Sequence, residues 1–87
     1  MLNIVYAPSF IRMYNKLDKN LQEEVRDKIL LFQNRENHIK LKVHKLHGRM
    51  ENRYSFTVNY KTRIIFRYGD KDTANLSYVG AHDDMYD

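Results

Sequence analysis

Histidine, arginine and tyrosine side chains occur along this chain in a pattern that suits acid–base chemistry on a phosphodiester. His44 and His47 lie three residues apart, Arg63 falls in a stretch of alternating polar and apolar residues, and His82 and Tyr86 follow in the final segment. Cleavage of RNA without a metal needs a base for the ribose 2′-hydroxyl, a cation for the scissile phosphate and an acid for the departing 5′ oxygen. Histidine suits the proton transfers, arginine the phosphate, and tyrosine can stack on an unpaired base. These residues are the candidate catalytic set.

Each of these residues also has an ordinary structural interpretation. Loop histidines can be solvated or can cap a backbone carbonyl, and Arg63 and Arg67 can form ion pairs on an exposed sheet face. Asp83 and Asp84 are most simply a solvated turn, and Tyr86 can cover the edge of a sheet. A site is favoured only if the elements that carry these residues bring them together.

The central element is predicted over residues 54–68, which are rich in aromatic and β-branched residues with a turn near the middle, the pattern of a β-hairpin. In its second half, apolar residues alternate with Arg63 and Arg67. Because successive side chains of a strand point to opposite faces, the two arginines are predicted to share one face. The last strand should pair with this one, which places Arg63 and His82 at the same end of the sheet.

Before the hairpin, the pattern predicts a strand and two helices. A strand over residues 2–6 is followed by a short helix over residues 10–17, for which Ser9 offers the cap. A second helix can be capped by Asp18 or by Asn20. Its predicted buried stripe consists of Leu21, Val25, Ile29 and Phe32.

After the second helix, residues 40–48 predict a partly extended connection that ends at a glycine, and residues 74–80 predict a final strand. The order of elements is then β-α-α-β-β-β. We expect an α+β fold with a single domain over residues 1–87. Its two N-terminal helices should pack on one face of a curved, mostly antiparallel four-stranded sheet and leave the other face open.

Basic residues are concentrated in the middle of the chain. The formal net charge is +4, but residues 1–34 carry +1, residues 35–68 carry +7 and residues 69–87 carry −4. Such a local excess favours a polyanion, and a membrane-binding chain would need a basic amphipathic helix instead. The candidate RNA-binding residues are Lys40, Lys42, Lys45, Arg49, Arg53 and Arg67.

The composition excludes several other classes of chemistry. There is no cysteine, which rules out disulfides, thiolate catalysis and cysteine-based metal sites and is consistent with the cytoplasm. Neither a signal peptide nor a transmembrane stretch is predicted. We expect a cytoplasmic protein with no membrane partner, no metal and no cofactor.

Three segments together resemble the RelE/ParE superfamily of toxins from type II toxin–antitoxin systems. They are His-Lys-Leu-His-Gly at 44–48, Tyr-Lys-Thr-Arg-Ile-Ile-Phe-Arg-Tyr at 60–68 and Tyr-Val-Gly-Ala-His-Asp-Asp-Met-Tyr at 78–86. The resemblance covers essentially the whole chain. The patterns His-x-Leu-x-Gly and Gly-x-His-x-Asp-x-aromatic are most similar to the YafQ branch.

The resemblance implies an mRNA interferase, an endoribonuclease that cuts messenger RNA on the ribosome, inhibits translation and is silenced by a cognate antitoxin protein. It implies that His44 matches the first histidine of the branch, His82 the terminal histidine that acts as general acid, Arg63 the phosphate-binding arginine and Tyr86 the closing aromatic residue. The hairpin has no match for the second imidazole and the carboxylate of the branch. The general base is therefore open between His44, His47 and a lysine such as Lys42 or Lys45.

Two other functions compete with RNA cleavage. A toxin of the ParE type would inhibit DNA gyrase and would not need a proton-transfer set, and a plain RNA-binding module would bind without turnover. The two histidine motifs favour the ribonuclease over both.

Overall fold

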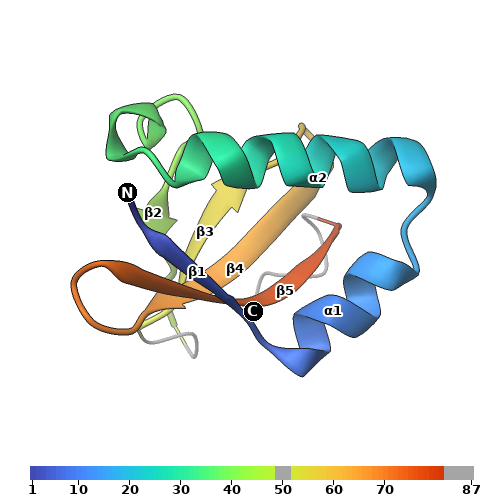
Figure 1. The fold of residues 1–87 in the computed structure, drawn as a ribbon. Helices are drawn as coiled ribbons and strands as arrows, with labels where there is room; N and C mark the ends of the chain where they lie inside the picture. Colours follow the sequence, from blue (N-terminus) through green and yellow to red (C-terminus); the bar gives the residue numbers. More distant parts are fainter. Residues whose placement is uncertain (49–51, 82–87) are drawn as a thin grey trace.

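The computed structural model describes residues 1–48 and 52–81, which form two α-helices, one 3-10 helix and five strands (Figure 1). In chain order the elements are β1 (Asn3–Tyr6), α1 (Pro8–Asn15), α2 (Lys19–Phe32), η1 (Arg35–Asn37), β2 (His44–Lys45), β3 (Tyr54–Thr57), β4 (Thr62–Tyr68) and β5 (Thr73–Ala81). Across the sheet the strand order is β1-β5-β4-β3-β2. The pairs β2–β3, β3–β4 and β4–β5 are antiparallel, and only the pair β1–β5 is parallel among the described strands.

The predicted α+β fold with a mostly antiparallel sheet is confirmed, but the sheet has five strands where four are predicted. The additional strand is β2, within the segment predicted to be a partly extended connection, and it pairs His44 with Ser55 and Lys45 with Tyr54. A strand of two residues is too short to show an alternating pattern, and its pairing with β3 depends on contacts distant in the sequence. Gly48, the glycine that ends this segment, has a φ of 74°, a conformation that glycine adopts without steric cost.

The first helix begins differently from the prediction. Its N-cap is Ala7, and Pro8 occupies the first turn, where a missing N–H costs nothing because that group has no partner within the helix. Ser9 is inside the helix, and its hydroxyl donates to the carbonyl of Ser77 at 2.7 Å, so it links α1 to β5 and does not cap the helix. Of the two caps predicted for α2, the structure uses Asp18, whose side chain accepts from the amide of Leu21 at 2.8 Å.

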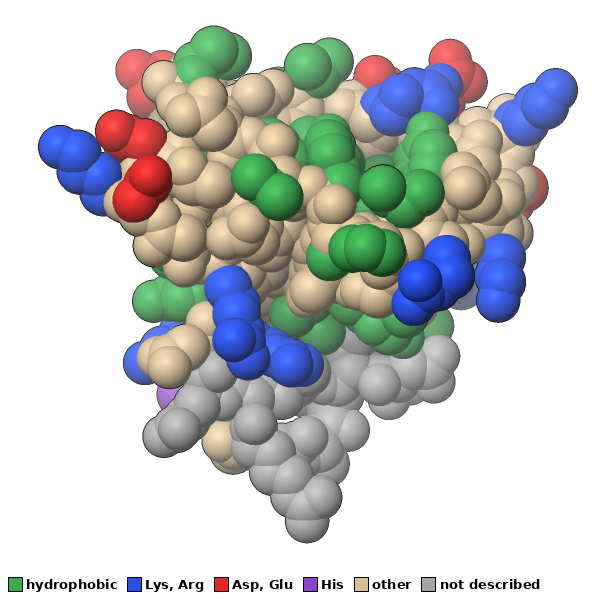
Figure 2. Space-filling model, turned by 60° about the horizontal axis from the view of Figure 1, so that its bottom comes forward, with side chains coloured by type: hydrophobic (Ala, Val, Ile, Leu, Met, Phe, Trp, Pro, Cys, Tyr) green, Lys and Arg blue, Asp and Glu red, His purple; other side chains and the backbone are tan. Residues whose placement is uncertain are grey.

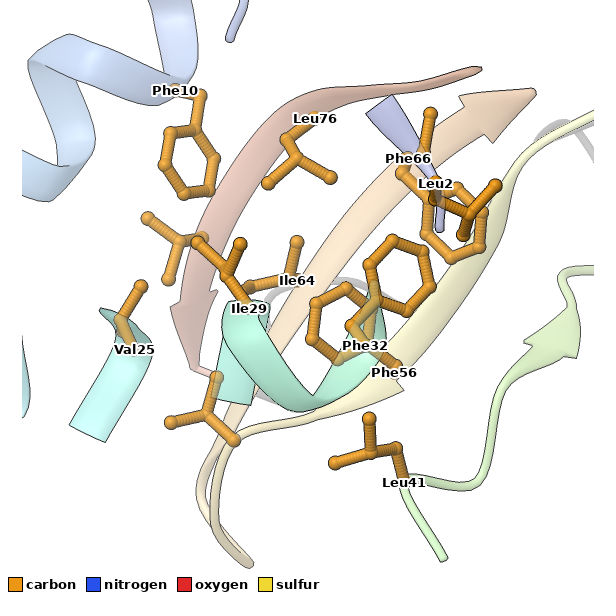
Figure 3. Packing of buried hydrophobic residues seen from close by; sticks show 13 residues of the cluster. Leu2, Phe10, Val25, Ile29, Phe32, Leu41, Phe56, Ile64, Phe66 and Leu76 are labelled. Carbon is orange, nitrogen blue, oxygen red and sulfur yellow. The ribbon is translucent and has the colours of Figure 1, made fainter. Parts of the chain in front are cut away.

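The core lies between the two helices and one face of the sheet (Figure 3). Phe32, near the end of α2, is fully buried and stacks against Phe56 of β3 with ring centroids 4.2 Å apart and against His38 at 4.8 Å. Phe66 of β4 meets the same ring edge-on at 4.8 Å. The predicted stripe of α2 is therefore correct, with Val25, Ile29 and Phe32 buried and Leu21 partly buried.

The opposite face of the sheet is partly covered. Leu46 and Ile65 are buried there and pack with Tyr78 in a second, smaller cluster. We call this side of the sheet, which carries Leu46, Ile65 and Tyr78, the outer face.

No helix among the described residues has the length and apolar character needed to cross a membrane.

Candidate functional site

The outer face is built from the alternation of β4. Ile64 and Phe66 are fully buried against the helices, so Arg63 and Arg67 project on the other side, Arg63 half-buried and Arg67 exposed. This confirms that the two arginines share one face. Because β4 pairs with β3 on one edge and β5 on the other, the arginines lie in the middle of the sheet rather than at its margin.

His44 belongs to the same face. The strand register places His44 opposite Ser55, Ser55 opposite Ile65 and Ile65 opposite Tyr78, so one row of side chains crosses four strands. The hydroxyl of Ser55 lies 3.5 Å from Nε2 of His44, which confirms that both side chains are on one side of the sheet. Arg63 is two strands and two residues away from His44, which corresponds to about 12 Å between their Cα atoms at ordinary strand spacings.

The imidazole of His44 is held in one orientation by the chain just before it. Nδ1 lies 2.7 Å from the carbonyl oxygen of Lys42. A carbonyl can only accept a hydrogen bond, so Nδ1 carries the proton in this contact and Nε2 of the neutral ring is an acceptor, with the Ser55 hydroxyl 3.5 Å away. Lys42 itself has a φ of 57°, in the left-handed region that L-residues rarely occupy, and this conformation belongs to the turn that directs its carbonyl at the ring. The result is an imidazole whose Nε2 can accept a proton.

Arg63 is anchored to the turn that precedes it. Its Nη1 donates to the carbonyl of Asn59 at 2.6 Å and lies 3.3 Å from the carbonyl of Thr62. These bonds use one nitrogen of the guanidinium and leave the donors on Nη2 and Nε. The guanidinium is thus held through Nη1, while Nη2 and Nε remain to bind an anion through two parallel hydrogen bonds, as in bidentate phosphate binding.

The strand register also places the chain that leads to the predicted terminal histidine. Arg63 pairs with Gly80, and Thr62 pairs with Ala81, the residue directly before His82. The end of β5 therefore lies beside the start of β4, as the sequence predicts. His82, Tyr86 and the candidate RNA-binding residue Arg49 lie outside the described residues.

The other candidate residues are distributed more widely. His47 is exposed and makes no hydrogen bond within the part of the chain that the structure describes, in contrast to His44. Lys45 pairs with Tyr54 and therefore projects to the helix side of β2, away from His44. Lys40 and Lys42 are exposed in the turn before β2, and Arg53 is half-buried just before β3.

The charge distribution of the surface agrees with this placement. In Figure 2 Lys and Arg side chains appear in both halves of the view, but the acidic side chains that it shows lie only in the upper half, and a histidine lies beside basic side chains at the lower left. Among the described residues no group of three or more His, Cys, Asp or Glu side chains could hold a metal ion.

Two features of the site have no clear signal in the sequence. Ser55 lies beside His44 only because β2 pairs with β3, and the carbonyl of Lys42 depends on a left-handed backbone at a lysine. The only sequence feature that points to the contact between His44 and the Lys42 carbonyl is their separation of two residues, which allows a local hydrogen bond between a side chain and the backbone.

Comparison with known proteins finds structures of similar fold but no similar sequence. No family model matches the sequence, and no curated protein matches it. Among solved structures, the RelBE2 toxin–antitoxin complex of Mycobacterium tuberculosis superposes with a TM-score of 0.77 at 15% identity, over 93% of this chain and 98% of that one. YafQ from Escherichia coli gives 0.69 at 15% identity over the full length of both chains.

A third neighbour is of the same kind. The YoeB–YefM complex of Staphylococcus aureus gives a TM-score of 0.72 at 17% identity, over 94% of this chain and 98% of that one. The fold is that of the RelE, YoeB and YafQ toxins. The fold expected from the RelE/ParE resemblance is therefore confirmed, and the RelE-like fold is shared over nearly the whole chain.

Proposed function

We propose that this chain is the toxin of a type II toxin–antitoxin pair and a cytoplasmic endoribonuclease that cuts messenger RNA on the ribosome. The observation that carries the proposal is that one face of a RelE-like sheet carries both an imidazole whose Nε2 is left as the acceptor nitrogen and an arginine with guanidinium donors still available. A module that only binds RNA would have no use for an imidazole held in a single tautomer, and neither would an inhibitor of gyrase.

In the proposed reaction the 2′-hydroxyl of a bound nucleotide loses its proton to Nε2 of His44 and attacks the adjacent phosphorus. The bond from phosphorus to the 5′ oxygen breaks, Arg63 holds the charge that gathers on the phosphate, and His82 gives the leaving oxygen its proton. The products are a 2′,3′-cyclic phosphate and a free 5′-hydroxyl. His44 is preferred to His47 as the base because its ring is held by the Lys42 carbonyl.

The proposed partners are translating ribosomes with their message and a cognate antitoxin. The RelBE2 and YoeB–YefM structures are toxin–antitoxin complexes. An antitoxin with an acidic segment would suit the +7 charge of residues 35–68. Co-purification with the product of a neighbouring gene tests this part of the proposal, and a host that tolerates unrestrained expression of the chain would count against it.

The arginines allow a matched test of the proposed cleavage. Primer extension on a message translated in a purified system compares wild type with Arg63→Ala, Arg67→Ala and His82→Ala. We expect new 5′ ends with wild type, a loss of about 100-fold or more with Arg63→Ala and His82→Ala, and a much smaller loss with Arg67→Ala, which only steers RNA. If Arg63→Ala and His82→Ala cut like wild type, the site is wrong; an intact message together with lost gyrase supercoiling would favour the ParE-type function.

A further inference from the structure

The turn between β3 and β4 carries Tyr60, a large aromatic side chain that belongs neither to the core nor to the candidate catalytic set. Tyr60 is 81% exposed, and the turn lies at the end of the sheet that passes beside α2 (Figure 1). Its neighbour Lys61 has Nζ 5.6 Å from the centre of the Tyr60 ring. A cation near one face of the ring leaves the other face for a ligand.

This turn is held in a defined shape. The side-chain oxygen of Asn59 accepts from the amides of Lys61 and Thr62, both at 2.9 Å. The backbone carbonyl of the same Asn59 accepts from Arg63 at 2.6 Å. One residue therefore fixes both the turn that presents Tyr60 and the arginine assigned to the phosphate, so the two side chains are positioned as a unit.

Beside Tyr60 the surface is hollowed. A depression of about 480 Å³ lies between this turn and the first half of α2, and Tyr60, Lys61, Asp18 and Glu24 are among the residues that line it. Asp18 accepts one hydrogen bond from α2, and Glu24 is 3.4 Å from the Asn59 amide nitrogen. The second oxygen of each carboxylate accepts no hydrogen bond from the described residues. An ionised carboxylate oxygen can only accept a hydrogen bond, so both oxygens are available to a donor on a ligand.

We propose that Tyr60 is a stacking platform for an unpaired nucleobase of the bound RNA, next to the nucleotide whose phosphate Arg63 holds. Aromatic side chains bind single-stranded RNA in this way, because every base has a π-face, and Lys61 supplies a cation for the neighbouring phosphate. The carboxylates of the hollow favour a base that carries an exocyclic amino group, so adenine, guanine and cytosine are preferred to uracil. The subsite deepens the proposed function and rests on it for its ligand.

RNA is favoured over a protein partner because this turn brings two cations together: Lys61 beside the Tyr60 ring, and Arg63, whose guanidinium donates to the carbonyl of Asn59. A protein docking on this tyrosine would have to desolvate those charges. A nucleotide brings a phosphate to neutralise them.

The test uses the full chain and single-stranded oligomers of about eight nucleotides, within the usual site sizes of such proteins. Each sugar carries a 2′-O-methyl group, so that the oligomer can bind but cannot be cut. Fluorescence anisotropy gives the affinity of wild type, Tyr60→Ala and Tyr60→Phe for oligomers of adenine, cytosine and uracil. Glu24→Gln is a fourth protein, because it keeps the shape of the hollow but replaces an acceptor with a group that also donates.

We expect Tyr60→Ala to bind the adenine and cytosine oligomers about tenfold more weakly, with Tyr60→Phe within about twofold of wild type because phenylalanine keeps the stacking face. Glu24→Gln should reduce the ratio by which the adenine and cytosine oligomers bind more tightly than the uracil oligomer. The proposal is overturned if wild type does not bind, if Tyr60→Ala binds as well as wild type, or if Tyr60→Ala weakens only the complex with a co-purified protein.

Failure of this subsite and failure of the proposed cleavage give different results. If wild type cuts translated message and Tyr60→Ala cuts it equally well at the same positions, the proposed ribonuclease activity is supported and the proposed Tyr60 subsite is rejected. If wild type binds the methylated oligomers through Tyr60 but leaves translated message intact, the Tyr60 subsite is supported and the proposed ribonuclease activity is rejected.

Discussion

At the scale of single residues, the site depends on Lys42 in two separable ways. Its carbonyl orients His44, while its side chain is one of the lysines that could act as a base in place of a histidine. A substitution that removes the side chain and keeps the carbonyl separates the two roles.

Lys42→Gly is that substitution. Glycine adopts a positive φ without the steric cost that an L-residue incurs, which offsets its larger loss of backbone entropy, so the free energy of unfolding should stay the same or rise by up to about 1 kcal/mol. Cleavage of translated message should remain within a few-fold of wild type. Thermal unfolding and primer extension measure the two effects. A folded variant without activity would make the Lys42 side chain the base.

At the scale of elements, much of the architecture could be predicted from the sequence because burial imposes a period on the chain. The stripe of α2 and the alternation around Arg63 and Arg67 follow from such periods, and the structure confirms both. The strand β2 could not be predicted, because two residues have no period and their pairing with β3 is long-range.

The candidate site is predictable to a lesser degree. That Arg63 is close to the end of the last strand follows from the neighbouring positions of β4 and β5. Which histidine is held, and by what, depends on a left-handed lysine and on the pairing of Ser55 with His44, neither of which has a sequence pattern. The Ser9 cap fails for a related reason, because Pro8 already starts the helix and the hydroxyl finds a carbonyl of β5.

The end of α2 is predicted to be the most sensitive part of the core. Phe32 is fully buried between His38 and Phe56, so Phe32→Ala removes several ring contacts and leaves a cavity that the rigid sheet cannot fill. We expect a loss of about 3–5 kcal/mol in the free energy of unfolding, a large share of the stability of a small domain. Urea unfolding followed by circular dichroism measures it.

Leu30→Ala is the control for this change. Leu30 lies on the same helix but is 63% exposed, and its substitution should cost no more than about 0.5 kcal/mol. Equal losses for the two variants would mean that the core does not centre on Phe32.

At the scale of the whole molecule, the basic middle of the chain sets how RNA is attracted. Binding to an uncut single-stranded oligomer should weaken as salt is raised, because each phosphate neutralised by a Lys or Arg releases counterions. Removing one exposed cation of the outer face, with Arg67→Ala, should lower the magnitude of the log–log salt slope by about 0.7, the value for one contact to a single strand. Anisotropy titrations over a series of salt concentrations give the slope, and an unchanged slope would remove Arg67 from the RNA path.

The most direct test of the account compares two histidines three positions apart. His44 is held by the Lys42 carbonyl on the same face as Arg63, whereas His47 has no such contact among the described residues. The measurement is primer extension on a message translated by purified ribosomes, with wild type, His44→Gln and His47→Gln at equal concentration. The account predicts that His44→Gln loses about 100-fold or more of the cleavage rate while His47→Gln stays within a few-fold of wild type. Full cleavage by His44→Gln, or a loss confined to His47→Gln, would contradict it.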